Sequence, residues 1–109
     1  MVEGSPTVAR FVEVAKRSQI PENGVIGVEV EGKTLALVNL SGVIYALDDS
    51  CPHEAGPLSD GQIEGEELVC PWHASHFDIK SGRVTMDPAM EDVTTYNVRV
   101  VGDAVEVEL

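Results

Sequence analysis

The chain has 109 residues, of which 43% are hydrophobic, and a formal net charge of −12, with 19 acidic residues against 7 Lys and Arg. This length predicts one domain, residues 1–109, and the acidic balance argues against nucleic acid and anionic membranes as partners. The N-terminus lacks the basic and apolar regions of a signal peptide, and no apolar run is long enough to span a bilayer. We therefore expect a soluble, cytoplasmic protein.

Short strands separated by turns are predicted for the first half of the chain. After an irregular start at residues 1–6, alternating apolar residues predict strands at 7–16, 25–31, 34–40 and 43–47. The 34–40 segment has apolar residues on both faces, so it is expected to be a central strand. Gly32 and Gly42 lie in the turns that flank it, which predicts an antiparallel meander of the last three strands.

Regular alternation stops at about residue 50 and returns after residue 80. Proline and glycine interrupt this interval and leave only short extended pieces near 67–69 and 77–79, so a loop-rich subdomain ordered by a bound metal is expected. A strand is predicted at 94–101, with Tyr96, Val98 and Val100 on one face. After a two-residue hairpin turn, residues 105–109 are expected to form a strand at a sheet edge. The predicted class is all-β, an antiparallel sandwich or barrel.

Both cysteines and two of the three histidines lie in two short stretches of the irregular interval. The stretches read Cys51-Pro52-His53 and Cys70-Pro71-Trp72-His73, so each supplies one thiol and one imidazole. A Cys₂His₂ zinc finger instead keeps its cysteines in one half and its histidines in the other. Two stretches that each supply one thiol and one imidazole suit a pair of metal ions that share the four ligands, with sulfur ligands on one ion and nitrogen ligands on the other.

Three other uses of these residues are considered. A Cys51–Cys70 disulfide would leave the histidine spacing unexplained, and no secretory signal points to an oxidising compartment. A structural zinc site could use the same four ligands. A Cys–His nucleophile would lack a third group to orient the histidine.

The pattern C-x-H, sixteen residues, C-x-x-H resembles the motif of Rieske [2Fe–2S] proteins, and residues 70–78 closely resemble the second loop of that family. The resemblance covers nearly the whole chain. It implies a Rieske fold with a cluster-binding subdomain at about residues 50–80, and one [2Fe–2S] cluster per chain. By the same resemblance, Cys51 and Cys70 would hold the inner iron, and His53 and His73 the outer one.

Other positions in the second loop refine this resemblance. Phe77 stands where high-potential respiratory members carry Tyr, and those members also have a disulfide for which this chain lacks the cysteines, so a low potential is expected. Ala74 replaces a common Gly. Ser75 has a family counterpart that donates a hydrogen bond to a bridging sulfide. Trp72 is expected to shield the cluster, and His76 is expected to be an exposed loop residue with no role.

The resemblance implies a one-electron carrier with no catalytic residues and no small-molecule substrate of its own. It would be a ferredoxin that passes electrons from a flavin-dependent NAD(P)H reductase to a terminal aromatic-ring-hydroxylating oxygenase. The chain has neither the length nor the ligands for the oxygenase's own catalytic domain. The alternatives are the small subunit of an assimilatory nitrite reductase and, from another class, a zinc-stabilised interaction module.

Charge is distributed unevenly along the chain. No Lys or Arg occurs between Lys33 and Lys80, the interval that contains both ligand stretches. Its acidic residues are Asp48, Asp49, Glu54, Asp60, Glu64, Glu66, Glu67 and Asp78. A negative surface around the metal predicts protein partners with basic docking surfaces.

Overall fold

Three antiparallel sheets make up most of the computed structural model, which describes residues 10–49, 58–70, 76–86 and 92–109. The first sheet contains, in spatial order, β1 (Phe11–Lys16), β11 (Ala104–Glu108) and β10 (Val98–Val101). The second contains β2 (Gly24–Val30), β3 (Lys33–Leu40), β4 (Val43–Asp48) and β9 (Thr95–Tyr96). The third contains β5 (Gln62–Glu64), β6 (Glu67–Val69), β7 (His76–Asp78) and β8 (Val84–Met86). This confirms the predicted all-β class.

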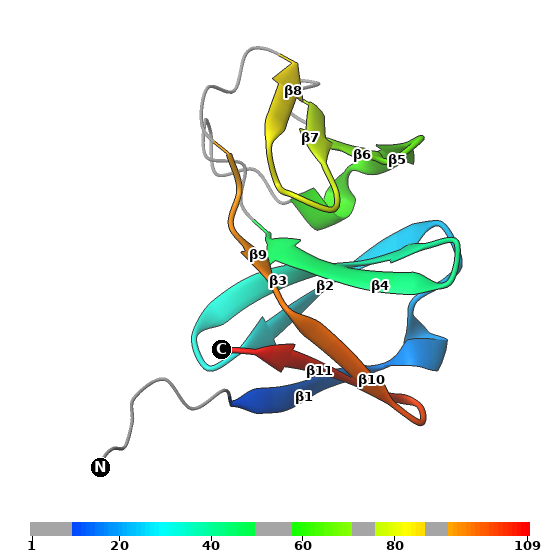
Figure 1. Cartoon of the computed structure of the whole chain (residues 1–109), viewed down its shortest axis with the longest axis vertical. Helices are drawn as coiled ribbons and strands as arrows, with labels where there is room; N and C mark the ends of the chain where they lie inside the picture. Colours follow the sequence, from blue (N-terminus) through cyan, green and yellow to red (C-terminus); the bar gives the residue numbers. More distant parts are fainter. Residues whose placement is uncertain (1–9, 50–57, 71–75, 87–91) are drawn as a thin grey trace.

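The first two sheets form a barrel-like body, and the third sheet lies above it (Figure 1). Two short 3₁₀ helices complete the described structure: η1 (Arg17–Gln19) follows β1, and η2 (Leu58–Asp60) precedes β5. In the ranges that the structure describes, no helix is long and apolar enough to cross a membrane.

Strand β3 is central, as predicted, because it pairs with β2 on one side and with β4 on the other. Its alternating side chains enter two separate cores. The barrel core contains Ile20, Leu35, Leu37, Ile44, Ala46, Val105 and Val107. The upper core contains Ala36, Val38, Leu47, Leu58, Leu68, Cys70, Phe77, Ile79 and Val93. One face of β3 is thus buried in the barrel core and the other face is buried in the upper core, against the third sheet.

Both turns of the predicted meander are confirmed. Glu31 and Gly32 have φ values of 51° and 82°, and Ser41 and Gly42 have φ values of 53° and 95°. Positive φ at both central residues of a two-residue turn matches the right-handed twist of the flanking strands. Glycine at the second position adopts its positive φ without the steric penalty of a side chain.

The prediction of an edge strand at 105–109 is wrong. Strand β11 is the middle strand of the first sheet, because β1, from the other end of the chain, pairs with its free side. Its alternating glutamates look like an exposed edge in the sequence. One of them, Glu106, accepts hydrogen bonds from Arg99 of the neighbouring β10.

The strand predicted at 94–101 is divided in two. Strand β9 pairs with β4 in the second sheet, whereas β10 pairs with β11 in the first, so the chain changes sheets at Asn97. Tyr96 and Val98 pack against the barrel core, as expected. Val100 does not share that burial, because 40% of its surface is exposed.

The described part of the predicted loop-rich subdomain is a four-stranded sheet. The short strands near 67–69 and 77–79 are present as β6 and β7, while β5 and β8 were not predicted. Leu58, Leu68, Phe77 and Ile79 are each 0% exposed. These few apolar residues give the third sheet a buried face, which the sequence did not predict.

Candidate metal centre

The two predicted ligand loops are bounded by elements that the structure describes. The first follows β4 and ends at η2, and the second lies between β6 and β7. Of the predicted ligands, Cys70 is described, while Cys51, His53 and His73 lie outside the described residues. Pro52, Pro71, Trp72, Ala74 and Ser75 also lie outside them, so the expectations for these residues stay predictions.

Glycine at position 61 allows the end of the first loop to approach the start of the second. A Cβ atom built on Gly61 would lie 2.0 Å from the Val69 carbonyl oxygen, a distance that no side chain can occupy. The backbone just after η2 therefore packs against the last residue of β6, directly before Cys70. From the sequence, this glycine predicts only an interruption of regular structure.

Cys70 is buried, and it has no disulfide partner within the part of the chain that the structure describes. It is 1% exposed and belongs to the upper core together with Leu58, Leu68 and Phe77. A thiolate buried among apolar side chains is costly unless a cation or a metal balances its charge. A metal bound through this sulfur suits that position, and two thiols with two imidazoles form a donor set typical of a [2Fe–2S] centre with mixed ligands.

His76 is not the exposed loop residue that the sequence predicted. It lies in β7 with 14% of its side chain exposed, and its Nδ1 donates to Glu67 Oε1 of β6 at 2.8 Å. This bond, followed by a hydrogen bond with Thr85 of β8, holds the pKa of the Glu67 carboxyl below its ordinary value. Three side chains thus link β6, β7 and β8 beside the second loop. This arrangement results from the register of β6 and β7, in which Val69 pairs with His76. The sequence alone does not give that register.

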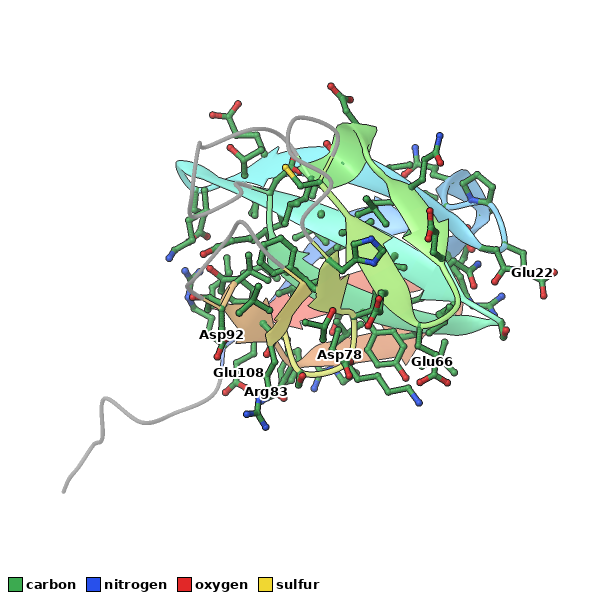
Figure 2. All side chains as sticks on the ribbon, turned by 90° about the horizontal axis from the view of Figure 1, so that it is seen from above. Glu22, Glu66, Asp78, Arg83, Asp92 and Glu108 are labelled. Carbon is green, nitrogen blue, oxygen red and sulfur yellow. The ribbon has the colours of Figure 1, made fainter. Side chains whose placement is uncertain are left out.

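The acidic interval is less uniform in space than along the chain. Figure 2 looks down on the third sheet and shows Glu66 and Asp78 on the same side as Arg83 and Asp92. Lys80 folds back to Glu66, with 3.4 Å between Nζ and Oε1. Asp49, counted in the sequence as a surface acid, is only 6% exposed. The exposed carboxylates of the third sheet nevertheless outnumber the nearby cations, and they include those of Asp60, Glu64 and Glu66.

Known proteins resemble this chain over most of its length. A model of the Rieske [2Fe–2S] domain matches residues 10–97. The ferredoxin component of the naphthalene 1,2-dioxygenase system of Pseudomonas aeruginosa is 41% identical over 100 residues, which are 92% of this chain and 96% of that protein.

Two solved structures have the same fold. The ferredoxin of carbazole 1,9a-dioxygenase from Nocardioides aromaticivorans IC177 gives a TM-score of 0.84 at 29% identity, covering 89% of this chain and 95% of that one. A chain in the complex of reduced oxygenase and oxidized ferredoxin in carbazole 1,9a-dioxygenase also gives a TM-score of 0.84, at 25% identity, covering 90% of this chain and 92% of that one. The matched residues 10–97 include both predicted ligand loops.

Proposed function

This chain belongs to the Rieske [2Fe–2S] domain family, and from that premise we propose that it is the ferredoxin of an aromatic-ring-hydroxylating dioxygenase system. It carries single electrons from a flavin-dependent NAD(P)H reductase to the terminal oxygenase, and it is not catalytic alone. The observation that supports this most directly is the 41% identity to a dioxygenase ferredoxin over 92% of the chain. That relative is itself covered to 96%, so the match extends over a whole carrier protein.

Cys51, His53, Cys70 and His73 are the proposed ligands of the cluster, in one domain that comprises residues 1–109. When bound, the [2Fe–2S] group supplies one reversible electron. The protein's part is to exclude water and to hold the ligands. Burial of Cys70 in the upper core supports a sulfur-ligated, water-shielded side of the site. By analogy with the family, the histidines face the surface, where a partner can approach.

The partners and the location belong to the same proposal. The relative from Pseudomonas aeruginosa is the ferredoxin component of a dioxygenase system, and the carbazole 1,9a-dioxygenase complex holds an oxygenase with a ferredoxin. Both support an oxygenase as the electron acceptor here. Acidic side chains on the third sheet favour basic docking surfaces on both partners. Cytoplasmic residence fits a carrier that receives its electrons from a NAD(P)H-dependent reductase.

Reconstitution tests the function. Anaerobically purified protein should be brown, with equal iron and acid-labile sulfide, and should restore NAD(P)H-dependent hydroxylation of naphthalene by a dioxygenase and reductase that lack their own ferredoxin. Stoichiometric zinc without iron or sulfide would point to the zinc-stabilised interaction module. Failure with the dioxygenase, together with support of NAD(P)H-dependent nitrite reduction by a nitrite reductase large subunit, would establish the alternative carrier role.

A further inference from the structure

The two ends of the first ligand loop are tied together by a compact set of hydrogen bonds. Asp49 immediately precedes residues 50–57, and Leu58 and Ser59 of η2 immediately follow them. The Asp49 carboxylate accepts from the Ser59 backbone N–H at 2.5 Å and from the Ser59 hydroxyl at 2.7 Å. The Asp49 carbonyl also accepts from the Leu58 N–H at 3.3 Å. We call Asp49 and Ser59 the loop clamp.

Within the loop clamp, Asp49 is buried and Ser59 is half-buried, and Asp49 is hydrogen-bonded to the barrel. Asp49 is 6% exposed, and its own N–H donates to the Thr34 carbonyl of β3 at 3.0 Å. Leu58, on the other side of the loop, is 0% exposed in the upper core. A buried carboxylate is stable only where donors satisfy it, so the bonds to Ser59 cannot be lost without cost.

Strand β2 packs directly against the loop clamp. A Cβ atom on Gly27 would lie 2.7 Å from Ser59 Oγ and 2.9 Å from Asp49 Oδ2. Both distances are too short for a side-chain carbon, so glycine at this point of β2 leaves the space that the two side chains occupy. The barrel wall thereby supports the clamp from behind.

We propose that Asp49 and Ser59 are positioning residues for the cluster, which close the first loop and hold the backbone that carries Cys51 and His53 in a binding geometry. Fixing both ends of a loop removes much of the conformational freedom that metal binding would otherwise have to remove. Groups that orient metal ligands also tune the bound metal. This proposal rests on the proposed [2Fe–2S] assignment.

The chain supplies a matched control. Asp103, in the turn between β10 and β11, accepts from the Ser18 N–H at 3.0 Å and from the Ser18 hydroxyl at 2.9 Å, which reproduces the chemistry of the loop clamp on the exposed barrel surface. Figure 1 places that turn at the end of the molecule away from the third sheet. Ser18→Ala therefore removes an equivalent hydroxyl without touching the loop.

The experiment compares Ser59→Ala, Gly27→Ala, Asp49→Asn and Ser18→Ala with the wild type as purified holoproteins. Loss of the cluster to an iron chelator should be roughly 2- to 12-fold faster in Ser59→Ala, the factor expected for one net hydrogen bond. Gly27→Ala should act in the same direction, because it pushes a carbon into the clamp. Asp49→Asn, which keeps an acceptor and can donate to the Ser59 oxygen, should be milder than Ser59→Ala. Ser18→Ala should match the wild type.

Two further measurements separate positioning from a general loss of stability. The reduced cluster of Ser59→Ala should give a broadened electron paramagnetic resonance spectrum and a shifted midpoint potential, while far-ultraviolet circular dichroism stays that of the wild type. Wild-type chelation rate, spectrum and potential in both Ser59→Ala and Gly27→Ala would overturn the proposal. If Ser59→Ala fails to fold, Gly27→Ala decides in the same way. Failure of the underlying assignment would look different, because the wild type itself would then show no [2Fe–2S] spectrum.

Discussion

Two histidines three positions apart are expected to have different roles, and this gives a direct test of the ligand set. His73 is a proposed ligand, whereas His76 is bound to Glu67 within the third sheet. His73→Ala should lose most iron and sulfide, because it removes one of the two proposed nitrogen ligands. His76→Ala should keep both, since it removes only the link to Glu67. Metal analysis of the two purified variants measures this. A wild-type iron content in His73→Ala would show that His73 is not a ligand.

Phe77 lies in the same core as the proposed ligand Cys70, so it is expected to influence how polar the surroundings of a bound cluster are. It is 0% exposed in the upper core with Cys70 and offers no hydrogen bond. Donors aimed at the sulfurs stabilise the reduced cluster and raise the potential, so the wild type should lie toward the lower end of the Rieske range of roughly −150 to +300 mV. In Phe77→Tyr, a net hydrogen bond of about 0.5–1.5 kcal/mol, formed in the reduced state, would raise the potential by roughly 20–65 mV.

Voltammetry of Phe77→Tyr beside a second Phe→Tyr variant tests this account. Phe11 lies in β1 of the first sheet, whereas Cys70 directly follows β6 of the third sheet. The Arg99 guanidinium carbon lies over the Phe11 ring, 4.3 Å from the ring centroid. Phe11→Tyr should leave the potential unchanged. A crystal structure of Phe77→Tyr should show whether the new hydroxyl lies beside the Cys70 sulfur. If it does and the potential falls or stays constant, this explanation of the low potential is wrong.

Among the elements, those defined by neighbours in the sequence were predictable. Strands β2, β3 and β4 follow one another through two-residue turns, so pattern and turn chemistry fix both their limits and their pairing. The position of β11 depends on β1, some ninety residues earlier in the chain, and no local pattern contains that pairing. The three-residue strands β5 and β8 are too short for alternation to be recognised.

The candidate site shows the same division. The proposed ligand set of Cys51, His53, Cys70 and His73 comes from residue type and spacing, which the sequence contains. The contacts around the ligands could not be predicted, since they depend on tertiary structure. Asp49 looked like one acid among many until the fold brought Ser59 to it. Likewise, Glu67 meets His76 only through the register of β6 and β7.

Strand β9 is joined to the end of β4 by a hydrogen bond that should respond to alkaline pH. The Tyr96 hydroxyl donates to Asp48 Oδ1 at 2.6 Å, and burial, followed by this bond, raises the pKa of Tyr96 from 10.0 to about 12. Because the folded pKa is raised, the contribution to stability is complete below about pH 10 and disappears as the pH approaches 12. The difference in free energy of unfolding between wild type and Tyr96→Phe should therefore shrink across this window.

Urea unfolding at a series of alkaline pH values measures that difference. The chain has two tyrosines, so phenolate absorbance in a Tyr45→Phe background reports Tyr96 alone. Its titration should be centred near the raised value. A difference in unfolding free energy that stays constant through the window would show that the bond to Asp48 does not stabilise the phenol.

At the scale of the whole molecule, the third sheet lies on the barrel. Its acidic side chains differ in how close they are to Cys70. In the β5–β6 hairpin, Gln62 pairs with Val69 and Glu64 with Glu67. Asp60, two residues before Gln62, therefore lies at the Cys70 end of the hairpin. Glu66 lies at the opposite end, three residues before Val69, which is roughly 10 Å along a β-strand. A partner that docks over the ligand loops should sense Asp60 more strongly.

Electron transfer to the oxygenase should slow as ionic strength rises, because acidic side chains steer a basic partner and salt screens that attraction. Asp60→Lys should slow the low-salt association rate more than Glu66→Lys does, because Glu66 is farther from Cys70 and already faces Lys80. Glu22→Lys changes the net charge equally but lies in the barrel, on the exposed turn before β2, so it is the matched control. Stopped-flow reduction of the oxygenase across a salt series measures all three variants. Equal slowing in the three would mean that only the net charge matters, and rates insensitive to salt would mean that the acids of the third sheet do not steer docking.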